Sequence, residues 1–341
     1  MAWIIVIFFL LCNLFLGVSQ VQASPRPNPA KEPQNLLLVV NQGDQSMSLV
    51  DPEAGVQIAK VKTNEVRAHE VTASPDGHLA YLPIYGNSGV GKPGTDGSSV
   101  EIVDLEKRAI VGSIELGPVR PHWVKFGPDG MLYVSAELDN AVDVLDPHLR
   151  KRVGSIPTEQ AESHMVVLSH DGHRAYTANV DAGTVSVLDL EARKLIKVIP
   201  VAEMVQRISI SQDGRWVFTA DQKRPQLAMI DTATNEVSNW IPLPAVGYGT
   251  TPTPDGKWLL VTLPSANQVA VVDMSQMKVV RTVPVGADPV QIMVRRDRPV
   301  AYVSCSGDGK VAVLNLKTWK VEKSIATGPG ADGLAWMQRK P

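Results

Sequence analysis

The chain has little cysteine, few aromatic residues and almost no net charge. Only 2 of its 341 residues are cysteine, 5% are aromatic, and 33 Lys and Arg face 35 Asp and Glu, for a formal net charge of −2. Nucleic-acid binding requires a clustered positive surface, so this balance and the absence of a Lys/Arg-rich stretch argue against a nucleic-acid partner. Only one cysteine, Cys305, lies after residue 23, so that part of the chain cannot form an internal disulfide. Its stability must therefore come from its hydrophobic core.

The sequence also lacks the motifs that are typical of several catalytic, metal-binding and heme-attachment sites. The chain has no nucleophile elbow, no His-Glu-x-x-His pair and no Cys-x-x-Cys-His heme attachment. Cys305 ends the apolar run at residues 301–305. A lone thiol in such a run is typically a small buried side chain and not a nucleophile. We therefore assign no catalytic residue and favour a binding protein over an enzyme.

A long hydrophobic run occurs only at the beginning of the chain. Residues 1–23 carry no charged side chain and end in Val-Gln-Ala, which suits signal peptidase cleavage. They predict a signal peptide and a periplasmic or secreted protein, with an uncleaved membrane anchor as the alternative. Residues 24–34, rich in proline, predict an extended tether, and residues 35–341 predict a single folded domain.

Turn residues are abundant, with 26 Gly and 25 Pro, and they recur with a fixed period. Each repeat contains an Asp-Gly turn and, farther along, a strand-like run that ends in an acid. After a first interval of 53 residues, these acids lie 42 or 43 residues apart, with Asn315 in the seventh place. Such a period indicates an array of one supersecondary unit. The acids are Asp51, Asp104, Asp146, Asp189, Asp231 and Asp273, and the turns begin at Asp76, Asp129, Asp171, Asp213 and Asp255.

Each repeat contains four short runs in which apolar and polar residues alternate, and helical periodicity is absent after residue 23. Alternation with period two predicts strands, and four strands in about 42 residues predict one blade of a β-propeller. The fold is therefore expected to be all-β, a seven-bladed propeller. Residues 35–40 match the second strand of a blade and residues 333–337 match a first strand. Both termini should therefore complete the last blade and remove an open sheet edge.

A four-residue signature within the repeat points to a known family. Tyr176-Thr177-Ala178-Asn179 has counterparts that begin at Tyr133 and Tyr302, and a Ser-Pro-Asp-Gly pattern stands at residues 74–77. These residues resemble the YVTN-family β-propellers over residues 35–337. The resemblance implies the propeller fold. It does not single out a function, because the superfamily includes surface-layer proteins, lactonases, lyases and heme-binding propellers.

Histidine occupies the same place in three successive repeats. This place lies where the chain enters the innermost strand of a blade, so the side chains should meet at one mouth of the central channel. Three converging imidazoles would form a ligand set for a transition metal such as zinc, copper or iron, with an open position. The alternatives are histidines copied with their blades, or the lining of a water-filled channel. A sixth, degenerate turn begins at Asp297. Seven residues before the acid of each turn stand His69, His122, His164, Gln206, Tyr248 and Val290.

Further polar residues are expected at the same mouth. The arginines either bind a small anionic ligand or pair with nearby carboxylates and only join blades, and we favour the pairing. Their charge would also keep the imidazoles neutral and available to a metal. The candidate ligand-binding residues are Arg67, Glu70, Arg120, Glu137, Arg207 and Tyr248.

A glycine-rich insertion at residues 86–98 accounts for the long first interval. It lies between the second and third strands of its blade and should emerge beside His69. A segment in that position would serve as a lid or recognition loop, with an unconstrained surface loop as the alternative.

We interpret the chain as an exported, monomeric propeller that binds a ligand, a metal ion or a protein partner at the histidine mouth. One alternative is a metal- or histidine-dependent hydrolase or lyase, similar to the lactonases, in which Glu70 or Glu137 completes the site. Another is a heme-binding propeller related to the heme domain of nitrite reductase, since histidines and arginines suit a carboxylate-bearing macrocycle. Membrane contact is expected only through an uncleaved N-terminal segment.

Overall fold

The computed structural model describes residues 33–64, 66–89 and 92–339. The signal peptide predicted at 1–23 lies outside these residues, as does most of the predicted tether at 24–34. None of the helices in the described residues has the length and hydrophobicity that a membrane span requires.

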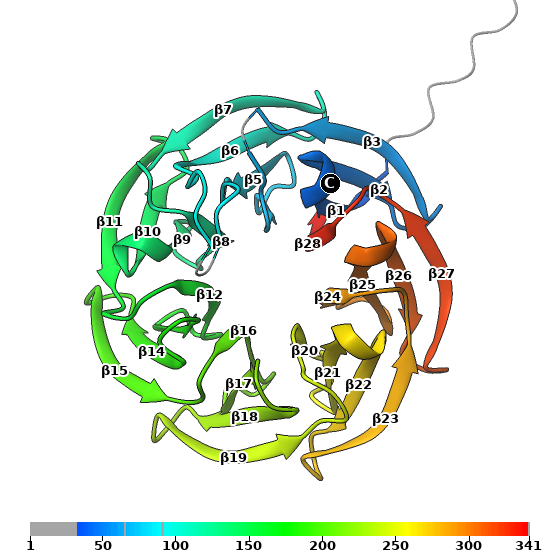
Figure 1. Cartoon of the computed structure of the whole chain (residues 1–341). Coiled ribbons are helices and arrows are strands. Elements are labelled where there is room, and N and C mark those ends of the chain that lie inside the picture. The colour runs from blue at the N-terminus through cyan, green and yellow to red at the C-terminus, as the bar shows by residue number, and fades with distance from the viewer. Residues whose placement is uncertain (1–32, 65, 90–91, 340–341) are drawn as a thin grey trace, which may run out of the picture. The chain divides into compact units, whose positions relative to one another are not determined.

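The 28 strands of the described chain form seven sheets of four antiparallel strands each. They form a ring in which the first strand of each sheet lies nearest the centre and the fourth lies outermost (Figure 1). The prediction of a seven-bladed β-propeller is confirmed. The inner strands are β4 (Thr72–Ala73), β8 (Pro121–Phe126), β12 (Ser163–Leu168), β16 (Val205–Ile210), β20 (Thr250–Pro252), β24 (Pro289–Val294) and β28 (Ala331–Gln338).

The other three strands of each blade follow the inner strand in chain order, except in the blade that the two ends of the chain share. The second strands are β1 (Asn35–Asn41), β5 (Leu79–Pro83), β9 (Leu132–Ala136), β13 (Arg174–Asn179), β17 (Trp216–Asp221), β21 (Trp258–Leu263) and β25 (Val300–Cys305). The third are β2 (Ser46–Asp51), β6 (Ser99–Asp104), β10 (Ala141–Asp146), β14 (Thr184–Asp189), β18 (Gln226–Asp231), β22 (Gln268–Asp273) and β26 (Lys310–Asn315). The outer strands are β3 (Val56–Lys62), β7 (Ala109–Glu115), β11 (Lys151–Pro157), β15 (Lys194–Pro200), β19 (Glu236–Pro242), β23 (Lys278–Pro284) and β27 (Lys320–Ala326). Single 3-10 turns are η1 (Gln42–Asp44), η2 (Glu137–Asp139), η3 (Pro264–Ala266) and η4 (Ser306–Asp308).

Strands from both ends of the chain form one blade, in the order β28-β1-β2-β3. Strand β1 pairs with β28 in an antiparallel register that sets Leu37 opposite Trp336 and Val39 opposite Leu334. The predicted sharing of the last blade is therefore observed. The pairing satisfies the edges that two unjoined strands would otherwise expose.

The repeating pattern of the sequence has a physical cause in each blade. In the turn at Asp213, the carboxylate accepts a bond from Ser211 Oγ at 2.5 Å and from the Arg215 backbone N–H at 3.1 Å. Gly214 follows with φ +73°, a conformation that glycine adopts without strain. Each outer strand is mostly exposed and buries its sixth residue against the blade. These residues are Val61, Ile114, Ile156, Ile199, Ile241, Val283 and Ile325.

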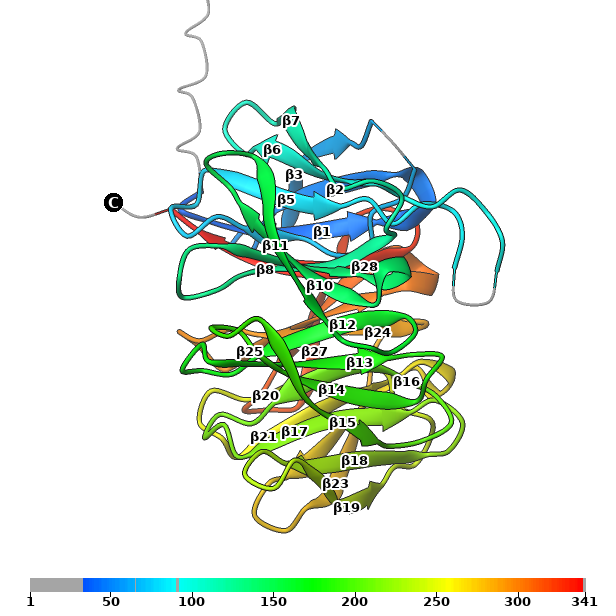
Figure 2. The ribbon, with the colours of Figure 1, turned by 90° about the vertical axis from the view of Figure 1, so that its left-hand side faces the viewer.

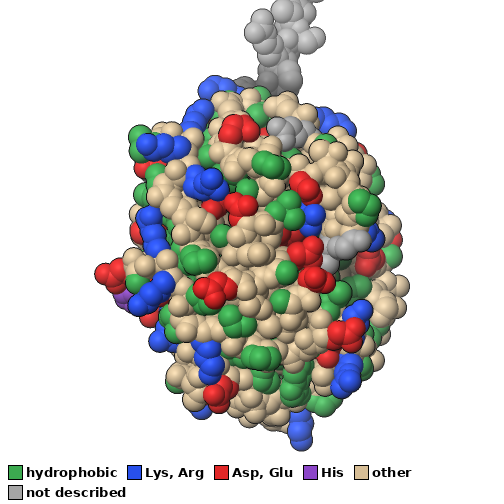
Figure 3. All heavy atoms as spheres, turned by 60° about the vertical axis from the view of Figure 1, so that its left-hand side comes forward, with side chains coloured by type: hydrophobic (Ala, Val, Ile, Leu, Met, Phe, Trp, Pro, Cys, Tyr) green, Lys and Arg blue, Asp and Glu red, His purple; other side chains and the backbone are tan. Residues whose placement is uncertain are grey.

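The outer surface carries charges of both signs. On the face shown in Figure 3, Lys and Arg side chains are interspersed with Asp and Glu, and neither sign forms an extended patch. Figure 2 shows that the connection between β5 and β6 projects from one face of the ring.

The thiol of Cys305 lies inside the propeller, with 1% of the residue exposed. Burial raises its pKa to about 11. Because the thiolate is the reactive form, we expect Cys305 to resist Ellman's reagent in the native protein at pH 8 and to react fully in denaturant. Rapid labelling of the native protein would contradict this placement.

Candidate functional site

The three histidines lie side by side at one mouth of the central channel. His122 and His164 are the second residues of β8 and β12, and His69 lies shortly before β4. The ring centroids of His69 and His122 are 5.1 Å apart, and those of His122 and His164 are 3.5 Å apart. Equivalent places in three neighbouring blades thus meet, as their spacing in the sequence suggests.

The orientation of the rings does not favour a three-histidine metal site. His122 and His164 are tilted by only 30° and stack face to face. Imidazole lone pairs lie in the ring plane, so stacked rings cannot direct their nitrogens at one ion. In the described part of the chain, no group of three or more His, Cys, Asp or Glu side chains could hold a metal ion. This geometry gives no support to the zinc or copper centre that the sequence suggested.

The ring nitrogens differ in what they contact. His164 Nδ1 is bonded to Glu137 Oε1, and its Nε2 lies 3.2 Å from Gln206 Nε2. His69 Nδ1 lies 3.2 Å from Gln42 Nε2. In contrast, His69 Nε2 and His122 Nδ1 are buried and have no hydrogen-bond partner among the described residues. Two nitrogens at the mouth therefore remain to be explained.

The unpaired nitrogens belong to neutral imidazoles. Burial holds the pKa of His69 and of His122 well below the usual range, and the positive charge of Arg207 adds to the effect. Arginine charge was expected to keep the histidines neutral, but burial is the larger cause. A neutral ring retains one lone pair for a metal.

Tyr85 covers the cluster, although no feature of the sequence singles it out. Its ring centroid lies 4.5 Å from that of His69, 5.1 Å from that of His122 and 6.1 Å from that of His164. Its hydroxyl donates to Glu137 Oε2 at 3.1 Å. Glu137 thus holds both Tyr85 and His164, and burial raises the pKa of the tyrosine.

Arg120 joins the insertion at residues 86–98 to the mouth. Its Nε donates to Asp96 at 2.8 Å, and its Nη1 lies 3.2 Å from Glu162 and 3.5 Å from Glu137. The backbone N–H of Arg120 also donates to the carbonyl of Gly97 at 3.0 Å. The described part of the insertion therefore packs beside the histidines, as expected, and is not an unconstrained surface loop.

Arg207 crosses the channel just below the histidines. It is 2% exposed, it is bonded to Glu70, and its Nη2 donates to Asp332 at 2.8 Å. Its Nη1 donates to Gln291 at 3.0 Å, and its guanidinium lies 5.1 Å from the centre of the Tyr248 ring. We call Glu70, Arg207 and Asp332 the channel ion cluster. It draws together residues from three blades.

Asp332 is a site residue that the sequence reasoning missed. It lies 42 residues after Val290, so it occupies the histidine place of the seventh blade. Register confirms this, because Ala331 opposes Asn41 as Pro289 opposes Cys305. Extending the period by one more repeat would have found it. This position was missed because the inner strand of the shared blade, β28, is the last strand in the chain.

The arginines mostly pair with carboxylates, which is the interpretation that we favoured. Arg120 and Arg207 are neutralised by buried or half-buried acids. Arg67 differs, because in the described residues its side chain donates only to the backbone carbonyl of Asn87, at 3.1 Å. Of Arg67, Arg120 and Arg207, Arg67 is therefore the one whose charge no described carboxylate neutralises, and it can pair with an anionic group of a ligand.

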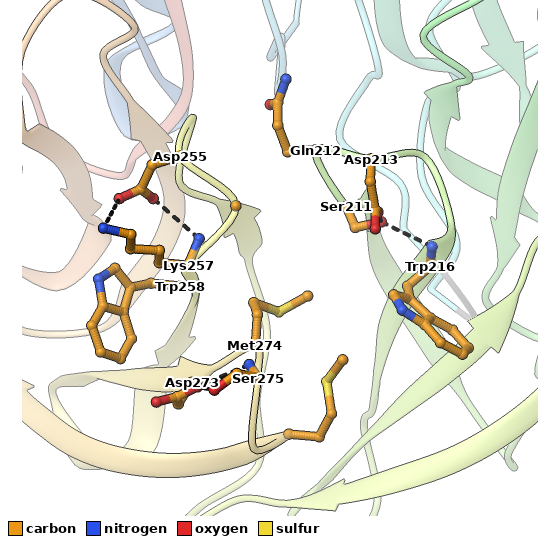
Figure 4. A pocket seen from close by; sticks show the side chains of 12 residues that line it. Ser211, Gln212, Asp213, Trp216, Asp255, Lys257, Trp258, Asp273, Met274 and Ser275 are labelled. Carbon is orange, nitrogen blue, oxygen red and sulfur yellow. Dashed lines mark hydrogen bonds and ion pairs between the residues drawn. The ribbon is translucent and has the colours of Figure 1, made fainter.

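A large groove elsewhere on the ring is lined by polar residues that bond within the turns of the blades. It has a volume of about 670 Å³ and lies between two neighbouring blades, where Trp216 and Trp258 line opposite sides (Figure 4). Its polar residues bond within their own turns: Trp216 N donates to Ser211 Oγ at 2.9 Å, and Lys257 N donates to Asp255 at 3.1 Å. We do not consider it a functional site.

One protein-family model matches part of the chain. The family model described as cytochrome D1 heme domain matches residues 126–255, which include His164 and Arg207 but not His69 or His122. A search of curated proteins finds no match. The resemblance to YVTN-family repeats stays a prediction.

Solved structures share the propeller fold. Hydrazine synthase of Kuenenia stuttgartiensis has a TM-score of 0.72 and 21% identity, covering 82% of this chain and 92% of that chain. A dihydro-heme d1 dehydrogenase, NirN, in complex with DHE has a TM-score of 0.65 and 19% identity, covering 90% of this chain and 67% of that chain. At such low identity, these likenesses establish the fold alone.

Proposed function

We propose that this chain is a heme-binding propeller that ligates the heme iron through a histidine of the channel mouth. The observation that carries the proposal is the pair of buried ring nitrogens without partners, His69 Nε2 and His122 Nδ1. Buried polar atoms are nearly always bonded, and a neutral imidazole is a common axial ligand of heme iron. One of these two nitrogens would bind the iron.

The residues at the mouth fit heme better than they fit a bare ion. Heme iron needs one or two imidazoles, whereas a bare ion needs three or four converging ligands, which the stacked rings do not supply. Arg67 offers a guanidinium to a heme carboxylate, and Tyr85 offers an aromatic face to the macrocycle. Bound heme would supply the redox and ligand chemistry of iron.

The comparisons support the same assignment. The matching family model describes a cytochrome D1 heme domain, and one structural neighbour is a dihydro-heme d1 dehydrogenase. The family match favours heme over the metal- or histidine-dependent hydrolase or lyase considered from the sequence. Export through the segment at 1–23 is part of the proposal and would place the heme site in the periplasm or outside the cell.

Access to the iron ligands requires a local rearrangement. Both unpaired nitrogens are buried, and the Tyr85 ring lies against both of their imidazoles. Heme can reach either nitrogen only if the Tyr85 ring moves together with the segment that Arg120 holds. The same covering would afterwards exclude water from the site.

Titration of the purified protein with ferric heme tests the proposal. We expect the Soret band to shift and to saturate at one heme per chain. The double variant His69→Ala/His122→Ala should bind heme about 100-fold more weakly, because the axial ligand is lost.

A matched control removes two histidines that lie at exposed turns. The variant His148→Ala/His173→Ala should retain the affinity of the wild type, since both residues are exposed. Equal affinity of all three proteins, or no saturable spectral change in the wild type, would contradict the proposal.

A further inference from the structure

A second cavity occupies the other end of the central channel. It has a volume of about 590 Å³ and is lined by residues of all seven inner strands. Glu70, Arg207 and Gln291 form part of its wall, so the channel ion cluster borders it on the side of the histidine mouth. A cavity of this size suits a small organic molecule.

Two cations without partners face this cavity. Lys125 is the fifth residue of β8, and its side chain is accessible to solvent inside the channel. Arg296 lies two residues after the end of β24 and is also exposed. In the described residues, neither side chain has a hydrogen bond or an ion pair. Desolvation by the surrounding channel walls lowers the pKa of Lys125, and the charge of Arg296 lowers it further, so the two positive charges act on each other.

The carboxylates that line the cavity are already paired. Glu70 is bonded to Arg207. Asp297 accepts two bonds from Arg295, at 2.8 and 2.6 Å. Neither acid is left to neutralise Lys125 and Arg296. The walls of low dielectric constant strengthen the field of both cations, and this end of the channel attracts an anion.

The rest of the wall indicates what kind of anion fits. Apolar side chains make up about half of it, among them Trp123, Met165, Ile208 and Trp336. An inorganic oxyanion would leave these surfaces in contact with water, whereas an organic anion would cover them.

We infer that this end of the channel binds a small organic dicarboxylate. Its carboxylates lie near Lys125 and Arg296, and its hydrocarbon part packs against the apolar wall. The channel ion cluster lies between this anion site and the histidine mouth.

Calorimetric titration of the heme-free protein with phthalate, at constant ionic strength, tests this inference. We expect saturable binding at one phthalate per chain. The variant Lys125→Met/Arg296→Gln should bind at least about tenfold more weakly, because both charge-assisted bonds are lost. Without phthalate, this variant should melt at the same temperature as the wild type or higher, since two repelling charges are removed.

Matched variants separate this site from general charge and from heme binding. Lys278→Met/Lys320→Met removes two cations from exposed outer-strand positions and should bind phthalate normally. His69→Ala/His122→Ala should also bind phthalate normally. Arg296 lies beyond the end of β24, so its substitution should not disturb the sheet. The single variant Arg296→Gln therefore provides the same test if the double variant does not fold.

Three results would overturn the inference. They are no binding of phthalate to the wild type, equal binding by the folded Arg296→Gln and wild-type proteins, and inorganic phosphate binding as tightly as phthalate. The last result would show that the apolar wall makes no contribution.

Discussion

Replacing Arg207 with methionine is expected to destabilise the propeller by about 3–5 kcal/mol. Arg207 is 2% exposed and is the cation between Glu70 and Asp332, which are 4% and 3% exposed. Methionine fills similar space but leaves two buried carboxylates without a counter-charge. Urea denaturation of the heme-free variant and wild type measures the difference.

The loss should depend on pH in a defined direction. Burial raises the pKa of Glu70 to about 7 in the folded protein, above its usual value of 4.5. The folded state therefore binds this proton more tightly than the unfolded state. The resulting stabilisation is complete below pH 4.5 and is lost as the pH rises through 7. Without Arg207 the pKa rises further, so Arg207→Met should cost more stability at pH 8 than at pH 5.

Neutralising the whole cluster provides the control. The triple variant Glu70→Gln/Arg207→Met/Asp332→Asn removes all three charges and should recover much of the stability that Arg207→Met loses. If Arg207→Met alone changes stability by less than about 1 kcal/mol at pH 8, the cluster does not hold the blades together as described.

Removing β28 is expected to abolish cooperative folding. A chain that ends at Gly330 lacks the inner strand of the shared blade and leaves one edge of β1 unpaired. It also loses the buried side chains of Leu334 and Met337 and the Asp332 partner of Arg207. These losses together exceed the roughly 5–15 kcal/mol that stabilise a typical domain.

Circular dichroism during heating measures this effect. A chain that ends at Arg339 keeps all of β28 and serves as the control, with the melting temperature of the full chain. A cooperative transition near that temperature in the chain that ends at Gly330 would show that the ring does not depend on the shared blade.

The sequence predicts the ring well because one short-range pattern repeats in every blade. Turn acids such as Asp213 and the buried sixth residues of the outer strands recur with the period of the blade. The shared blade could also be predicted, from strand-like runs at both ends of the domain. The convergence of His69, His122 and His164 follows from the same repeat.

The parts of the site that break the repeat could not be predicted. Tyr85 immediately precedes an insertion that no other blade contains, so no equivalent position draws attention to it. The stacking of His122 on His164 depends on the side chains of Glu137 and Gln206, which contact His164 across blade boundaries. Spacing places residues on a strand, but it does not orient an imidazole ring.

The central claim is that an imidazole of the histidine mouth ligates heme, and imidazole rescue tests it most directly. The variant His69→Gly/His122→Gly removes both side chains whose ring nitrogens have no partner. We predict that its ferric heme complex loses the wild-type Soret spectrum and that added free imidazole restores both the spectrum and the affinity. If the variant gives the wild-type spectrum and affinity without imidazole, these histidines do not bind the iron and the account is wrong.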